Sequence, residues 1–140
     1  MLLIQHPSSR INKLSNLLIA TLNIRSIHNK SAYISELITD NHIDILSLTE
    51  TWHSHSDDLP LRRSIPPRYS IMDLPRDATS ADTGLVNHGG LALLYRSNYI
   101  ARRIQLPIKP LTFEVLVCSL RLAAISLVSG TIYRPGSRVP

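Results

Sequence analysis

Aromatic residues are scarce in this sequence, which has five tyrosines but only one phenylalanine and one tryptophan among its 140 residues. Aliphatic side chains must therefore fill any core. The composition, 44% hydrophobic and 18% charged, supplies enough of them to exclude wholesale disorder. A chain of this length fits one domain and excludes two substantial ones.

Cysteine occurs once, at Cys118, which excludes an internal disulfide. It lies in an apolar run typical of a buried strand, and such a thiol fits a reducing, intracellular compartment. The N-terminus lacks a secretory pattern, because the apolar residues 1–4 are followed at once by Gln5, His6 and Pro7. We therefore expect an intracellular protein.

Long hydrophobic runs are also lacking. The longest uncharged stretches, residues 14–24 and 122–133, fall well short of the roughly 20 apolar residues that a membrane-spanning helix needs. We therefore expect a soluble protein without a membrane partner.

Acidic residues are nearly missing from the C-terminal part of the chain, where Glu114 is the only one after residue 100. The whole sequence carries 15 Lys and Arg against 10 Asp and Glu, a formal charge of +5 with a pI near 9.8. A basic C-terminal region suits a polyanion such as nucleic acid, and it also suits an ordinary basic protein.

The hydrophobic pattern at the start of the chain predicts a strand, a helix and a second strand. Residues 16–23 and 43–48 are nearly continuous apolar runs of strand length. Between them, residues 31–40 carry apolar side chains at helical spacing. Such a unit normally places its two strands parallel in one sheet.

The rest of the chain predicts a polar loop with about one helical turn over residues 53–68, and a second polar loop over residues 75–88. The segment 98–104 is expected to be the hairpin partner of the strand before it. In chain order, the further strands are expected at residues 69–74, 91–95, 98–104, 113–121 and 123–133. An α/β or α+β sandwich follows.

Polar side chains end two of the predicted strands. Asn23 closes the first strand and Glu50 follows the second, and open sheets bind ligands at these carboxyl ends. A carboxylate and an amide oxygen form a hard, oxygen-only partial site that suits Mg²⁺. The alternative is that both side chains hydrogen-bond a turn, and spacing alone leaves the two interpretations open.

Three other motifs are weaker. His53 and His55 invite a zinc interpretation, but no third ligand stands near them, so we expect solvated loop residues. Gly89 and Gly90, directly before a strand, indicate a turn or bulge more readily than a phosphate cradle. Tyr133 ends the last strand and offers a phenol to a phosphate oxygen, although a tyrosine there is more often a packing residue.

In combination, these segments resemble a known family. They are similar to the opening of the endonucleases encoded by non-LTR (LINE-type) retrotransposons, a branch of the endonuclease/exonuclease/phosphatase superfamily. The resemblance runs from about residue 17 to residue 136. The matching segments, in order, are Leu22–Lys30, Ile43–Trp52, Gly89–Tyr95, Phe113–Leu116 and Ile132–Pro135.

The resemblance implies a two-sheet α/β (α+β) sandwich of the DNase I-like type. It implies metal-dependent hydrolysis of phosphodiester bonds, by an endonuclease that nicks DNA for retrotransposon insertion. Asn23 and Glu50 would hold the catalytic metal, Mg²⁺ or Mn²⁺, and Tyr133 would contact the scissile phosphate. DNA is the implied partner, no small-molecule cofactor is expected, and the location would be nuclear.

The family's Gly-Asp-x-Asn and Ser-Asp-His blocks are not found in the sequence, so the resemblance covers the N-terminal half of the family's domain. We therefore expect an irregular leader at residues 1–15, a partial domain at 16–136 and a tail at 137–140. The family's general base, a His paired with an Asp, belongs to the missing part. We accordingly expect the isolated chain to be inactive and to self-associate through its uncovered final strands.

Two other functions remain open on the sequence. A non-catalytic remnant that binds nucleic acid through its basic C-terminal part would fit the missing acid/base half. A superfamily phosphatase acting on phosphorylated lipids or nucleotides would fit Asn23 and Glu50, although the Thr-Glu-Thr-Trp segment argues against it.

Overall fold

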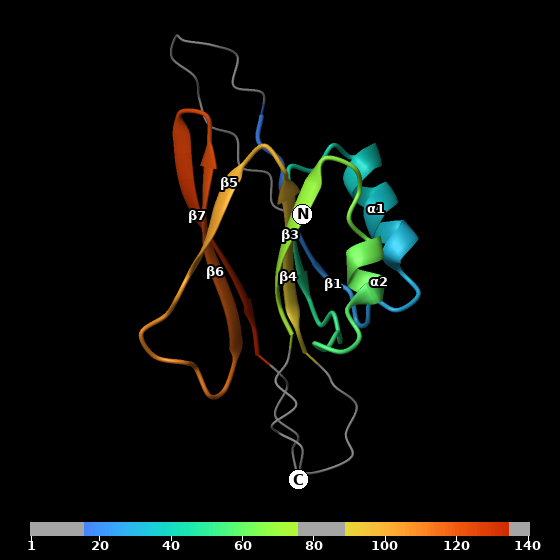
Figure 1. Cartoon of the computed structure of the whole chain (residues 1–140), viewed down its shortest axis with the longest axis vertical. Coiled ribbons are helices and arrows are strands. Elements are labelled where there is room, and N and C mark those ends of the chain that lie inside the picture. The colour runs from blue at the N-terminus through green and yellow to red at the C-terminus, as the bar shows by residue number, and fades with distance from the viewer. Residues whose placement is uncertain (1–15, 76–88, 135–140) are drawn as a thin grey trace.

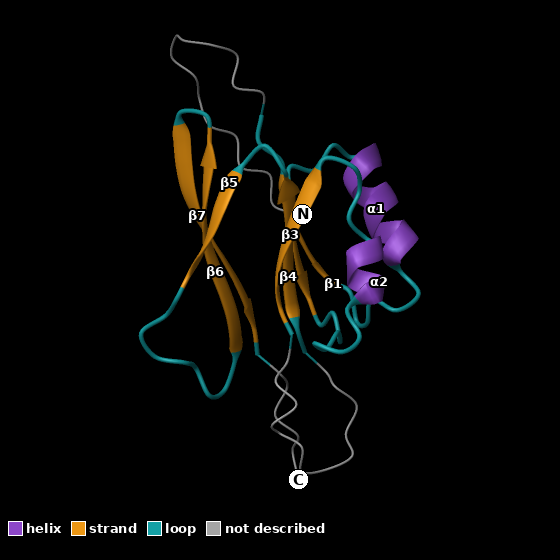
Figure 2. Cartoon of the chain, in the orientation of Figure 1, coloured by secondary structure: helices purple, strands orange, loops and turns teal. Residues whose placement is uncertain are grey.

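The computed structural model describes residues 16–75 and 89–134, which form two sheets and two helices (Figures 1 and 2). Neither helix is long and apolar enough to cross a membrane. The expected leader at 1–15 and tail at 137–140 lie outside the described residues. The elements are β1 Ile19–Asn23, α1 Ser31–Asp40, β2 Ile45–Thr49, α2 Leu59–Arg63, β3 Tyr69–Leu74, β4 Leu91–Arg96, β5 Ile100–Ile104, β6 Glu114–Leu122 and β7 Ile125–Tyr133.

The first sheet has the strand order β1-β2-β4-β3. Its β1 and β2 pair in parallel, as the strand–helix–strand pattern predicts, because α1 returns the chain across one face of the sheet. The β2–β4 and β3–β4 pairs are antiparallel. Both helices cover the same face of this sheet, and the second sheet lies on the opposite face (Figure 1).

Two apolar clusters fill the spaces on either side of the first sheet. Successive side chains of a strand point to opposite faces, and β2 and β4 are buried on both, which explains their continuous apolar runs. The cluster under the helices includes Ile34, Ile38, Leu46, Leu48 and Leu94. The cluster between the sheets includes Ile45, Leu93, Leu116, Leu120 and the buried Cys118.

The expectation that residues 98–104 form a hairpin with β4 is wrong. Both edges of β4 are taken, by β2 and β3, so β5 pairs with β6 in the second sheet, whose order is β5-β6-β7. The chain passes from the first sheet to the second between β4 and β5. Asp44 fixes this segment, because its carboxylate accepts hydrogen bonds from Arg96 Nε and Tyr99 Oη. The predicted two-sheet α+β sandwich is confirmed.

Candidate active site

The carboxyl ends of β1 and β2 meet at one end of the first sheet, here called the rim: residues 23–27 and 49–52. There, Asn23 Nδ2 donates a hydrogen bond of 2.9 Å to Glu50 Oε1, across 27 positions of sequence. The parallel register produces this contact, since Asn23 lies opposite Thr49 and Glu50 is the next residue. The structure thus brings together the two residues that the sequence pairs as a partial oxygen site.

The two segments of the rim remain paired beyond the ends of their strands. Backbone hydrogen bonds of 2.8–3.0 Å join residues 24, 26 and 27 to the carbonyl oxygens of residues 49–51. Lys30 also holds this bend, because its Nζ donates to the carbonyl oxygens of Ile24 and Arg25. The rim is therefore fixed by backbone contacts on both sides of Glu50.

Four residues of the rim have left-handed backbone although none is glycine. The φ angle is +46° at Arg25, +78° at Ser26, +55° at Glu50 and +56° at Trp52. Such conformations cost about 1–3 kcal/mol each and cluster at functional sites, where the surrounding contacts hold them. The contacts around the rim therefore hold four residues in a backbone conformation that is costly for residues other than glycine.

His53 is buried, with 1% of its surface exposed, so the expectation of a solvated loop histidine is wrong for this residue. Its Nδ1 lies 2.6 Å from Thr51 Oγ1, and its Nε2 lies 3.0 Å from Asp73 Oδ2. Asp73 comes from β3, 20 positions further along the chain, which is why the loop sequence gives no sign of the pairing. His55 is exposed, as expected.

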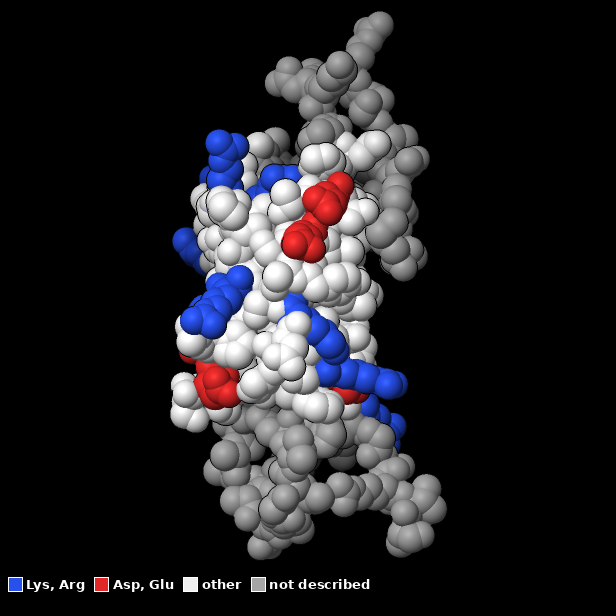
Figure 3. Space-filling view, turned by 90° about the vertical axis from the view of Figure 1, so that its right-hand side faces the viewer, with Lys and Arg blue, Asp and Glu red and all other residues white. Residues whose placement is uncertain are grey.

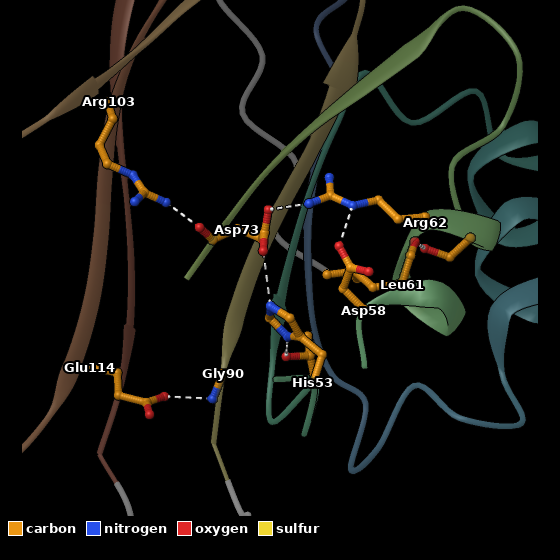
Figure 4. Close-up of polar contacts among 10 residues, drawn as sticks. His53, Asp58, Leu61, Arg62, Asp73, Gly90, Arg103 and Glu114 are labelled. Atoms are coloured by element: carbon orange, nitrogen blue, oxygen red, sulfur yellow. Dashed lines mark hydrogen bonds and ion pairs between the residues drawn. The ribbon is translucent and has the colours of Figure 1, made fainter. Parts of the chain in front are cut away.

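Asp73 contacts three basic side chains, which come from three parts of the fold (Figure 4). Its carboxylate contacts His53 and, at 3.3 Å, Arg62 of α2, while its backbone carbonyl accepts from Arg103 of β5. The hydrogen bond from His53, with the charges of Arg62 and Arg103, holds the pKa of Asp73 below its ordinary value, although burial acts in the opposite direction. The carboxylate is therefore ionised at neutral pH.

The glycine pair before β4 packs directly against the rim. Gly89 and Gly90 have φ angles of +142° and +86°, and their carbonyl oxygens accept hydrogen bonds from the N–H groups of Trp52 and Thr51. Gly90 N–H in turn donates to Glu114 Oε2 of β6 at 2.8 Å (Figure 4). The pair is thus a place where two backbone segments approach closely, which the turn-or-bulge interpretation did not specify.

Tyr133 lies at the same end of the sandwich as the rim. It stands opposite Glu114 in the β6–β7 register, and Glu114 reaches Gly90 beside the rim. Its ring packs, partly buried, against the cluster between the sheets. The structure therefore gathers all three predicted site residues at one end of the molecule, with a direct contact between Asn23 and Glu50.

Charged side chains on the helical side of the molecule form small separate groups of both signs rather than one basic surface (Figure 3).

One contact near the rim was not predicted from the sequence: His28 Nε2 lies 2.9 Å from Asp57 Oδ2, with both side chains about half exposed. Thr51, Asp73 and Glu114 were missed as well. Thr51 pairs with His53, which the sequence places in a solvated loop, and the partners of Asp73 and Glu114 lie 11 to 30 positions away in the chain.

The donor set of the rim fits a hard divalent cation. Glu50 supplies a carboxylate, and Asn23 keeps its amide oxygen as an acceptor while its nitrogen donates. Mg²⁺ is commonly held by one or two carboxylates, with waters and substrate phosphates as the other ligands. Among the described residues no group of three or more His, Cys, Asp and Glu side chains is placed to hold an ion. Waters and substrate phosphates would therefore have to complete the coordination shell of a cation bound by Asn23 and Glu50.

A sequence profile of the endonuclease/exonuclease/phosphatase family matches residues 20–132. The chain belongs to this family. Its members are typically metal-dependent hydrolases of phosphodiester bonds. No curated protein sequence matches the chain significantly.

Solved structures of other proteins share its fold. A humanized TDP2 of D. rerio aligns with a TM-score of 0.55 at 13% identity, over 87% of this chain and 52% of that one. The human Nocturnin catalytic domain, with bound sulfate, aligns with a TM-score of 0.53 at 16% identity, over 84% and 49%. The likeness shows the DNase I-like sandwich of the family, and the chain spans about half the length of these structures.

Proposed function

We propose that this chain is the metal-binding, N-terminal half of a phosphodiester hydrolase that depends on Mg²⁺ or Mn²⁺. The observation that carries the proposal is the 2.9 Å contact between the Asn23 amide and the Glu50 carboxylate, at a rim whose backbone is held in a costly conformation. Membership of a family of typically metal-dependent hydrolases supports it.

The side chains of the rim would divide the work on a phosphodiester. Glu50 and Asn23 would hold the cation through oxygen atoms, and when bound the cation would supply neutralisation of phosphate charge and stabilisation of the leaving oxygen. Tyr133 donates its phenolic hydrogen to a phosphate oxygen. The hydrogen bond from Asn23 orients the Glu50 carboxylate beforehand, which reduces the entropy lost on binding.

Within this class, the proposed substrate is DNA and the proposed reaction is the nick that begins insertion of a non-LTR retrotransposon. The order and spacing of Leu22–Lys30, Ile43–Trp52 and Ile132–Pro135 support this choice. The excess of basic residues after residue 100 suits a polyanionic substrate, and a nuclear, intracellular location would follow.

On its own, the chain is proposed to bind the cation without cleaving DNA. His53 has both ring nitrogens hydrogen-bonded inside the protein, so it does not reach a water at the rim. A general acid or base typically contributes roughly 10²–10⁴-fold to such a reaction. The rest of the domain, about half in the solved structures that share the fold, would supply this group.

Trp52 makes the metal proposal testable, because it is the only tryptophan and lies two residues from Glu50. An excited tryptophan passes energy to a nearby Tb³⁺, an ion that prefers oxygen ligands. We expect Tb³⁺ luminescence sensitised by Trp52, and we expect excess Mg²⁺ to abolish it by competition. Glu50→Gln should lower the Tb³⁺ affinity roughly tenfold or more, because even the loss of a residue that only supports a metal ligand has an effect of that size. Glu36→Gln removes an exposed carboxylate of α1 and should change nothing. Equal luminescence in the Glu50→Gln chain would overturn the proposal.

Plasmid nicking tests the separation of binding from cleavage. With Mg²⁺, the chain should nick supercoiled DNA no faster than its Glu50→Ala variant. Nicking that depends on Glu50 would show that the chain already carries a complete catalytic set, against the division proposed here.

A further inference from the structure

His53 stands at the centre of a hydrogen-bonded network behind the rim (Figure 4). Its side chain is fully buried, yet both ring nitrogens have partners. An ionised Asp73 only accepts hydrogen bonds, so Nε2 carries the hydrogen of that contact. In the neutral ring Nδ1 is then an acceptor, and the Thr51 hydroxyl donates to it at 2.6 Å.

Thr51 connects this network to the rim. Its N–H donates to the Gly90 carbonyl at 3.2 Å, and its carbonyl accepts from Ile27 N–H at 3.0 Å. Glu50 directly precedes it, with a φ of +55°, and a residue other than glycine keeps such an angle only where its surroundings impose it. Fixing Thr51 therefore fixes one side of the strained Glu50 peptide.

The glycine pair is fitted to the same network. A Cβ on Gly90 would lie 2.5 Å from Thr51 Oγ1 and 3.2 Å from His53 Nδ1. The contact between Thr51 and His53 thus occupies the space that any other residue at position 90 would need. In return, the Gly90 backbone encloses the contact and keeps it dry, which strengthens a hydrogen bond.

The far side of His53 is anchored in two other layers. Asp73 accepts from Arg62 at 3.3 Å, and Arg62 Nε also donates to Asp58 at 2.9 Å. Arg103 ties the backbone of Asp73 to the second sheet. His53 therefore has a fixed position that depends on α2, β3 and β5, none of which belongs to the rim.

We propose that His53 is a positioning residue: through the Thr51 hydroxyl it holds Glu50 in the orientation in which the rim binds a divalent cation. This rests on the proposed function, because it takes Glu50 as a metal ligand. His53 itself touches neither cation nor substrate, and its ring acts as a strut between Asp73 and Thr51.

Thr51→Val tests the proposal with little change of shape, because a methyl group replaces the hydroxyl. We expect the affinity for Tb³⁺, read through Trp52, to fall by up to roughly 10–100-fold, the effect of removing a group that hydrogen-bonds a metal ligand directly. The Thr51 hydroxyl acts on Glu50 through the backbone that the two residues share. Thr51→Ser keeps the hydroxyl and should restore most of the affinity. His53→Gln can still donate to Asp73 but lacks a ring acceptor for Thr51, so it should behave like Thr51→Val.

Asp44→Asn is the control for general destabilisation. Asp44 lies at the opposite end of β1 and β2, where it accepts from Leu18 N–H, Arg96 and Tyr99, so its loss should lower the melting temperature and leave Tb³⁺ affinity unchanged. Equal affinity losses in Asp44→Asn and Thr51→Val would contradict the positioning role. Unchanged affinity in both Thr51→Val and His53→Gln would also overturn the positioning role.

Glu50→Gln separates this role from the proposed function. If Glu50→Gln lost Tb³⁺ binding while Thr51→Val and His53→Gln kept it, the proposed function would survive and the positioning role would not. Unchanged binding in Glu50→Gln would overturn the proposed function itself.

Discussion

Thr131 donates a hydrogen bond of 3.0 Å through Oγ1 to Ser47 Oγ, and this bond joins the two sheets across 84 positions of sequence. Both side chains are buried, and the sheets around them meet through aliphatic side chains. Because a buried hydroxyl is costly without a partner, the bond specifies how β7 sits on β2.

Thr131→Val should therefore lower the free energy of unfolding by about 1–3 kcal/mol, the cost of stranding a buried polar group. Removing both hydroxyls, in Ser47→Ala with Thr131→Val, should cost less than the sum of the two single changes. Urea unfolding followed by circular dichroism measures all three variants. Strict additivity would mean that the two hydroxyls do not interact.

Gly90→Ala should be severely destabilising, by about 2 kcal/mol or more, because it combines a left-handed backbone with a clash against Thr51. Gly130 is the matched control, since a Cβ there would meet nothing within 4 Å. Its change to alanine should be neutral or stabilise by up to about 1 kcal/mol. Similar unfolding midpoints for the two alanine variants in urea would refute this difference.

Asp73 should make the protein sensitive to acid. The hydrogen bond from His53 lowers its folded pKa from the ordinary value of 3.8, so its stabilising contribution is present above pH 3.8 and is lost as the pH falls through the folded pKa. Asp73→Asn should be less stable at pH 7 and should approach the wild-type stability as the pH falls below about 4. A stability difference that stays constant from pH 7 to pH 2 would count against this assignment.

The edge strand β7 should drive self-association. Val128 is 68% and Ile132 64% exposed on this strand, and exposed apolar edges pair with other chains. Sedimentation velocity should show association that grows with concentration and that Val128→Lys reduces. Tyr33→Lys, which adds the same charge at an exposed site of α1, should leave it unchanged. A monodisperse wild-type monomer at micromolar concentrations would contradict self-association through β7.

The start of the fold could be predicted from the sequence because its signals are local. The apolar runs of β1 and β2 and the helical spacing between them imply parallel strands, and parallel strands end at one rim, which brings Asn23 to Glu50. The pairing of β5 depends on which edges of β4 are already occupied, and local spacing does not contain that information.

The burial of His53 could not be predicted for a related reason. Its immediate neighbours are polar loop residues, while the groups that enclose it, Asp73 and the Gly90 backbone, come from two later strands. The one visible signal was the glycine pair itself. A position that tolerates no Cβ implies a close neighbour, but the sequence does not say that the neighbour is a histidine.

Paramagnetic broadening by Mn²⁺ in the amide NMR spectrum of this chain decides whether Asn23 and Glu50 hold a divalent cation. If they do, small amounts of Mn²⁺ broaden first the amides of residues 23–26, 49–52 and 89–90, excess Mg²⁺ restores them, and Glu50→Gln abolishes the effect. Broadening centred instead on the surface carboxylates Asp57 and Asp58, with the resonances of the rim unaffected, would contradict the assignment.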